Sequence, residues 1–149
     1  MTTDFKPTNP DYARIVRESF AKQGLMTTLG ARIITIEPGY CVIEMPYAPE
    51  VSQQQGFFHG GAIGAIADTA AGYAAYSLMP AGSEVLTVEY KLNLVRAAVP
   101  PLVRAEGRVL RAGKTLTVCR ADVFHRTKEG QEVCALLQAT MIRVEPVQR

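Results

Sequence analysis

The chain has 149 residues, of which 48% are hydrophobic and 20% are charged, and its formal net charge is +2. This length and composition predict one globular domain over residues 1–149 and exclude an intrinsically disordered chain. The small net charge and the lack of a long lysine and arginine run argue against nucleic acid as a partner.

The first predicted element is an amphipathic helix over about residues 10–23. Asn9 is a typical N-cap residue, Pro10 suits a first helical turn, and Gly24 is typical of a helix end.

A β-hairpin is predicted next. Residues 31–37 and 40–47 are rich in β-branched and aromatic side chains, and Pro38-Gly39 separates them. Residues 48–58 then form a polar loop.

A long helix is predicted from Gly60 to about Leu78, built mainly from alanine and glycine and stopped by Pro80. As a membrane span it would hold Asp68 at its middle, where a carboxylate is costly in lipid. We therefore expect a buried helix in a soluble core and no membrane contact.

The rest of the chain predicts strands, because apolar and polar residues alternate in four segments: 84–97, 102–111, 115–126 and 132–144. With the hairpin, this makes about six mostly antiparallel strands and one long helix inserted after the second. One face of such a sheet is exposed to solvent, and we expect the alanine-rich helix to pack against the other. The predicted fold class is α+β, a sheet wrapped around one helix.

The three cysteines, at positions 41, 119 and 134, have neither a close pair nor the spacing of a metal site. No signal-peptide pattern opens the sequence. We therefore expect reduced, buried cysteines and a cytoplasmic location.

Asp68 is the chemical signal in this sequence, because it is a lone carboxylate in a helix of small apolar residues. Desolvation should raise its pKa and make it basic. The free N–H groups at the start of the same helix, near Gly60, can polarise a carbonyl group. Nine residues separate His59 from Asp68, which predicts opposite sides of the helix and roughly 13 Å along its axis. Two antiparallel copies of the helix would bring these groups together, so the sequence favours a site shared between two subunits.

The pattern Gln53, Gly56, His59-Gly60-Gly61 and Asp68 resembles the hotdog-fold acyl-CoA thioesterases of the phenylacetate-degradation (PaaI-like) type. The resemblance extends through "LTVEYKLNLVR" and "RAGKT" and covers roughly residues 25–145. It implies five to six antiparallel strands around one long central helix. It also implies a homodimer with a continuous sheet, often paired into a homotetramer.

The resemblance further implies hydrolysis of an acyl-CoA, with coenzyme A as part of the substrate and no other cofactor or metal. Asp68 matches the catalytic carboxylate, and Gly60 matches the backbone donor to the thioester carbonyl. His59 matches a residue that braces the turn, Gln53 helps to place substrate or water, and Thr87 orients water against the carboxylate. The neighbouring Gln54 and Gln55 leave the register of Gln53 open.

Residues implied for substrate and coenzyme A binding are Gly61, Arg96, Arg111, Gly113, Lys114 and Thr115. A solvated hairpin turn is the alternative interpretation of Arg111 and Lys114.

Several questions stay open from the sequence. Asp68 can act as general base or as nucleophile. The alternatives to a thioesterase are a hotdog hydratase or dehydratase and a non-catalytic acyl-CoA binding module. The acyl group is not specified, although the small residues Ala65, Ala71, Gly72 and Ala75 leave room for a tail. We expect the other histidine, His125, to be exposed.

Overall fold

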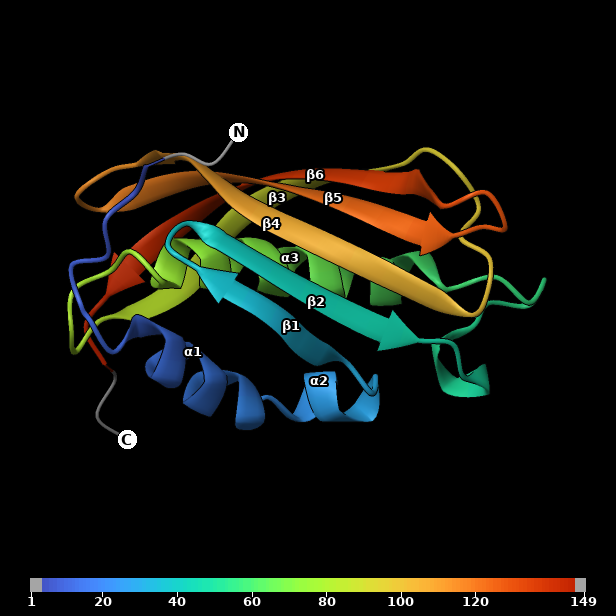
Figure 1. Cartoon of the computed structure of the whole chain (residues 1–149), viewed down its shortest axis with the longest axis horizontal. Helices are drawn as coiled ribbons and strands as arrows, with labels where there is room; N and C mark the ends of the chain where they lie inside the picture. The colour runs from blue at the N-terminus through green and yellow to red at the C-terminus, as the bar shows by residue number, and fades with distance from the viewer. Residues whose placement is uncertain (1–3, 147–149) are drawn as a thin grey trace.

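A six-stranded antiparallel sheet wraps around one long helix in the computed structural model, which describes residues 4–146 (Figure 1). The strand order is β1-β2-β4-β5-β6-β3. The helices are α1 (Tyr12–Ala21), α2 (Gly24–Thr28), the 3-10 turn η1 (Pro49–Val51) and α3 (Gly60–Tyr76). The strands are β1 (Arg32–Glu37), β2 (Tyr40–Pro46), β3 (Glu84–Leu94), β4 (Leu102–Ala112), β5 (Leu116–Arg126) and β6 (Gln131–Val144).

The predicted fold class is confirmed, including the hairpin and the position of the long helix. Gly39 between β1 and β2 has a φ of +75°, a left-handed conformation that glycine adopts without strain. That residues 1–149 form a single domain stays a prediction.

The N-terminal helix differs from its prediction, because it is broken into two. Gln23 adopts an extended conformation with ψ of 103°, and Gly24 begins α2 instead of ending α1. The break lets Met26 enter the core, where it is 1% exposed. Asn9 is not the N-cap either: Asp11 holds that position, and the Asn9 side chain accepts a hydrogen bond from the Asp11 N–H.

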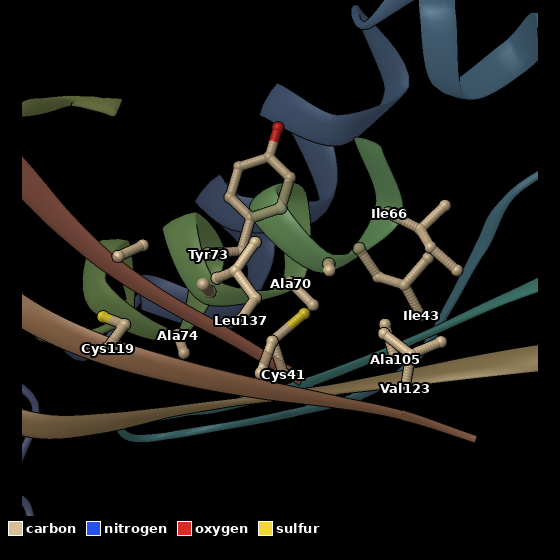
Figure 2. Close-up of a cluster of buried hydrophobic side chains, with 14 of the residues drawn as sticks. Cys41, Ile43, Ile66, Ala70, Tyr73, Ala74, Ala105, Cys119, Val123 and Leu137 are labelled. Atoms are coloured by element: carbon tan, nitrogen blue, oxygen red, sulfur yellow. The ribbon is translucent and has the colours of Figure 1, made fainter. Parts of the chain in front are cut away.

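The core lies between α3 and the concave face of the sheet, and Figure 2 shows small side chains of α3 facing the strands. Ala70 and Ala74 are fully buried there. Gly107 on β4 allows the closest approach, because a Cβ at that position would lie 2.3 Å from the Ala70 backbone. Any side chain at residue 107 would therefore push the sheet off the helix.

The convex face of the sheet is polar, as the alternating pattern predicts. Arg104 bridges Glu44 and Glu106, at 3.2 and 3.0 Å. Arg120 pairs with Asp122 at 2.7 Å. The residues of these ion pairs are not among the site residues predicted from the sequence.

The edge strand β3 is the most exposed part of the sheet. It pairs only with β6, and Leu86, Val88 and Tyr90 are all about half exposed. A bulge between Thr87 and Glu89 shifts the register against β6. Because side chains alternate along a strand, the bulge lets both Thr87 and Leu92 face α3.

Candidate active site

Asp68 is half-buried at the middle of α3 and faces β3. The Thr87 hydroxyl donates a hydrogen bond of 2.8 Å to its Oδ1. Burial raises the pKa of the Asp68 carboxyl above its ordinary value, and the Thr87 hydrogen bond offsets part of that rise. A carboxylate in this setting is more basic than an exposed one, and one of its oxygens is held in place.

The N-terminus of α3 presents a backbone donor. His59 is the N-cap, and its Nδ1 accepts a hydrogen bond of 2.8 Å from the Gly61 N–H. Within residues 4–146, no group accepts a hydrogen bond from the Gly60 N–H. The positive end of the helix dipole lies behind that N–H, so Gly60 offers a site for a carbonyl oxygen or an oxyanion. The hydrogen bond from Gly61 to His59 stabilises this turn, so the Gly61 N–H is already used as a donor.

Gly60 lines a surface pocket of about 420 Å³ together with Gln53, Gln55 and Arg96. Gln53 and Gln55 are linked, because the Gln53 amide nitrogen donates to the Gln55 side chain at 3.2 Å. Gln54 is exposed and does not line this pocket. The predicted partners Gln53 and Gly60 are thus brought together, with Gln55 beside them.

Asp68 lies in a different pocket, of about 130 Å³, which Thr87 also lines. Gly60 and Asp68 are eight residues apart in α3, which corresponds to roughly 12 Å along the axis. Gly60 abuts Leu94 and Asp68 abuts Thr87, so both residues face β3 and the length of the helix separates them. The opposite sides predicted for His59 and Asp68 stay a prediction.

The predicted coenzyme A turn connects β4 and β5. Its geometry is fixed by the backbone, with the Gly113 N–H donating to Leu116 and the Arg143 N–H donating to Thr115. Lys114 and Gly113 line a small pocket near Ala75 and Leu78, at the C-terminal end of α3. Arg111 and Lys114 are exposed. Within one chain this turn therefore lies near the end of α3 opposite to Gly60. The sequence pattern missed Arg143, which shares the Lys114 pocket.

The expectation that His125 is exposed is wrong. It is 3% exposed, and its Nδ1 accepts a hydrogen bond of 3.0 Å from the Val99 N–H. Its Nε2 lies 3.4 Å from Glu132, which also pairs with Arg96 at 3.3 Å. His125 thus anchors the segment after β3 that contributes Arg96 to the Gly60 pocket.

Two of the small residues expected to leave room for an acyl tail do not do so. Ala71 and Ala75 are fully buried in the core, whereas Gly72 lines the Asp68 pocket. Sequence reasoning missed Gln23, which lines the same pocket from the break between α1 and α2.

Over residues 4–146, no three His, Cys, Asp or Glu side chains cluster in a way that could hold a metal ion. In the same part of the chain, no helix is both long and apolar enough to cross a membrane.

Known proteins are similar to this chain in sequence and in fold. Residues 55–134 match the sequence signature of the thioesterase superfamily. A thioesterase family protein from Silicibacter pomeroyi is 40% identical, with a TM-score of 0.88 over 91% of this chain and 99% of its own. A 1,4-dihydroxy-2-naphthoyl-CoA hydrolase from Listeria monocytogenes is 26% identical over 106 residues, or 71% of this chain and 86% of its own. The PaaI protein of E. coli, from the phenylacetic acid degradation operon, matches in fold with a TM-score of 0.81 at 19% identity, over 94% of this chain and 98% of its own.

Proposed function

Since this chain belongs to the thioesterase superfamily and is a hotdog-fold thioester hydrolase, we propose that it hydrolyses an acyl-CoA to a free acid and coenzyme A. The resemblance to hotdog thioesterases that the sequence suggested is confirmed by the family match, and the PaaI-like fold by the structural match. The acyl-CoA substrate is supported by the Listeria relative, which is named as a hydrolase of such a thioester.

The chemistry follows from the two groups described above. The thioester carbonyl oxygen accepts a hydrogen bond from the Gly60 N–H, aided by the helix dipole. Asp68 then either removes a proton from the attacking water or attacks the carbonyl carbon itself to form an anhydride, which water opens. In both routes the coenzyme A thiolate leaves and a carboxylate remains. Thr87 holds the Asp68 carboxylate, and Gln53 contacts the substrate beside Gly60.

The site is shared between two copies of the chain in this proposal. An edge strand with unpaired backbone groups and exposed apolar side chains, such as β3, is suited to pairing with a second copy of itself. Two-fold pairing of β3 would continue the sheet and run the two α3 helices antiparallel. The Gly60 pocket of one chain would then face Asp68 of the other. Pairing of such dimers into a tetramer is a further part of the proposal.

Coenzyme A would bind through its phosphates to Lys114 and Arg111, with Gly113 and Thr115 shaping the turn. Arg96 lines the same pocket as the Gly60 donor and would contact the substrate there. The reaction needs no metal or redox cofactor, because the carboxylate and the backbone donor supply both the base and the electrophilic assistance.

The observation that carries the proposal is the half-buried carboxylate of Asp68, with its raised pKa and its single oriented oxygen. A module that only binds acyl-CoA has no use for a carboxylate that is costly to bury. A hydratase pairs its carboxylate with a histidine as acid and base, but His59 accepts a hydrogen bond from Gly61 and serves as a cap.

The first prediction tests this role. Asp68→Asn keeps the size of the side chain and its acceptor for Thr87, but it removes the base. We expect turnover of acyl-CoA to fall on the order of 10³-fold, measured as release of free thiol. Asp11→Asn, the same change at an exposed position on α1, is the control and should retain wild-type turnover. Near-normal turnover by a folded Asp68→Asn protein would overturn the proposed function.

A further inference from the structure

The break between α1 and α2 places one side chain of the N-terminal segment against α3. Gln23 leaves the helical path, and its Nε2 donates a hydrogen bond of 2.7 Å to the Tyr73 hydroxyl. The Ser19 hydroxyl lies 3.1 Å from the same oxygen. Figure 2 shows the Tyr73 hydroxyl pointing away from the sheet, toward the N-terminal helix. Three polar groups from two parts of the chain thus meet on the outer side of α3.

This polar cluster is part of the wall around Asp68. Gln23 and Tyr73 line the same pocket as Asp68 and Thr87. Gln23 lies outside residues 55–134, the segment that matches the family signature. The pocket therefore combines the reactive carboxylate with a hydrogen-bonding group that the N-terminal segment of this chain adds.

The Tyr73 hydroxyl has two partners, Ser19 and Gln23, so it uses one end of the Gln23 amide. Within residues 4–146, the Gln23 Oε1 accepts no hydrogen bond, and it is not enclosed as a buried unsatisfied atom. Gln23 itself lines the pocket, and the bond from Nε2 to Tyr73 fixes the direction of its amide.

We propose that Gln23, oriented by Tyr73, selects acyl groups that carry a neutral hydrogen-bonding group, such as a hydroxyl, toward their far end. This specificity rests on the proposed acyl-CoA hydrolysis. A plain hydrocarbon tail would cover the Gln23 amide without replacing its bonds to water, which costs binding energy. A terminal carboxylate is disfavoured too, because no lysine or arginine lines the pocket and Asp68 repels a second negative charge.

The test compares thioesters of coenzyme A that differ only at the end of the acyl chain. For chains of four to eight carbons, kcat/KM is measured for the plain acyl group, its terminal-hydroxyl counterpart and its terminal-carboxylate counterpart. At the best chain length we expect the hydroxyl form to be favoured about 10-fold over the plain form, which is the effect of one neutral hydrogen bond. The carboxylate form should be the slowest.

Gln23→Met removes the amide and keeps the length of the side chain. We expect the ratio of hydroxyl to plain substrate to fall to about twofold or less. Tyr73→Phe, which keeps the ring in place and frees the amide to rotate, should lower the same ratio. Gln138→Met, the same change at an exposed position on β6, should leave the ratio at its wild-type value.

The possible failures are distinct. If the wild-type protein hydrolyses none of the thioesters, the proposed function is wrong and this inference falls with it. If it hydrolyses plain and hydroxyl forms equally at every chain length, the function stands and the inference is overturned. A wild-type preference that survives in both Gln23→Met and Tyr73→Phe would also overturn it.

Discussion

The two pockets along α3 carry different chemical groups, a hydrogen-bond donor in one and a carboxylate in the other. The pocket at the helix N-terminus offers the Gly60 N–H as a donor, together with Gln53 and Arg96, but it holds no carboxylate. The pocket at the middle of the helix holds the carboxylate of Asp68, but its helical backbone N–H groups are already bonded within α3. Each pocket thus lacks what the other supplies.

The difference supports the proposal that one copy of this chain carries two half-sites of a site shared between two chains. The proposed hydrolysis needs the donor and the carboxylate within about 3 Å of the reacting atoms. Along a single helix the two groups are roughly 12 Å apart, because eight residues each add about 1.5 Å. In the proposed dimer, a second chain with its helix reversed completes each pocket.

The largest effect expected in the donor pocket comes from Gly60→Pro. Proline deletes the N–H, and His59, with φ of −68° and ψ of 134°, already has the conformation that a following proline requires. We expect kcat to fall about 10² to 10³-fold, as for the loss of an oxyanion donor.

Gly60→Ala is the matched control, because it keeps the N–H and brings a Cβ into the same contact with the flexible end of Leu94. It should retain most of the activity. Equal losses in both variants would show that crowding, and not the donor, matters at residue 60.

In the carboxylate pocket, Thr87→Val should alter the pH dependence. The Thr87 hydrogen bond holds the pKa of Asp68 below the value that burial alone would give. In the proposed mechanism Asp68 must be ionised to act, so activity should be lost as the pH falls through its pKa. Without the hydrogen bond that pKa rises further, and the acidic limb of the kcat/KM profile should move to higher pH.

Thr140→Val provides the control, because Thr140 donates to Glu89, a carboxylate that lies outside the Asp68 pocket. Its profile should match the wild-type one. An unmoved acidic limb in Thr87→Val would mean that Asp68 is not the group that titrates.

A smaller effect is expected at the predicted coenzyme A turn, which lies apart from both Gly60 and Asp68. Lys114→Ala should raise KM about threefold at low salt and leave kcat unchanged, because an exposed phosphate contact is made equally in ground and transition states. High salt should reduce the difference. Lys128→Ala, in the turn between β5 and β6, is the control. An unchanged KM in Lys114→Ala at low salt would remove this turn from the coenzyme A site.

The sequence was sufficient for the fold because its strongest patterns are local. The alanine-rich segment after His59 predicted α3, which begins at Gly60 and ends at Tyr76, two residues before the predicted end. Strand alternation predicted the sheet. Asp68 and Gly60 were identified because a lone acid in an apolar helix and a glycine-rich helix start are visible without a structure.

The missed features depend on tertiary contacts. The bulge in β3 changes which residues face α3, and alternation alone cannot locate it. The break at Gln23 accompanies the burial of Met26, and His125 is buried where it accepts a hydrogen bond from Val99. These contacts join residues far apart in the sequence or depend on how the helices pack, so no short sequence pattern encodes them.

The most direct test of the shared site combines two inactive proteins, Asp68→Asn and Gly60→Pro. Refolded together in equal amounts, they should form mixed dimers in about half of the population by random pairing. Each mixed dimer would hold one intact site, with the native Gly60 from one chain and the native Asp68 from the other.

We predict that thiol release returns to about a quarter of the wild-type rate, because half of the dimers each regain one of two independent sites. Each variant refolded alone is the control and should stay inactive. If native mass spectrometry shows mixed dimers and the mixture remains inactive, the two half-sites do not complete each other across chains, and the central claim is contradicted.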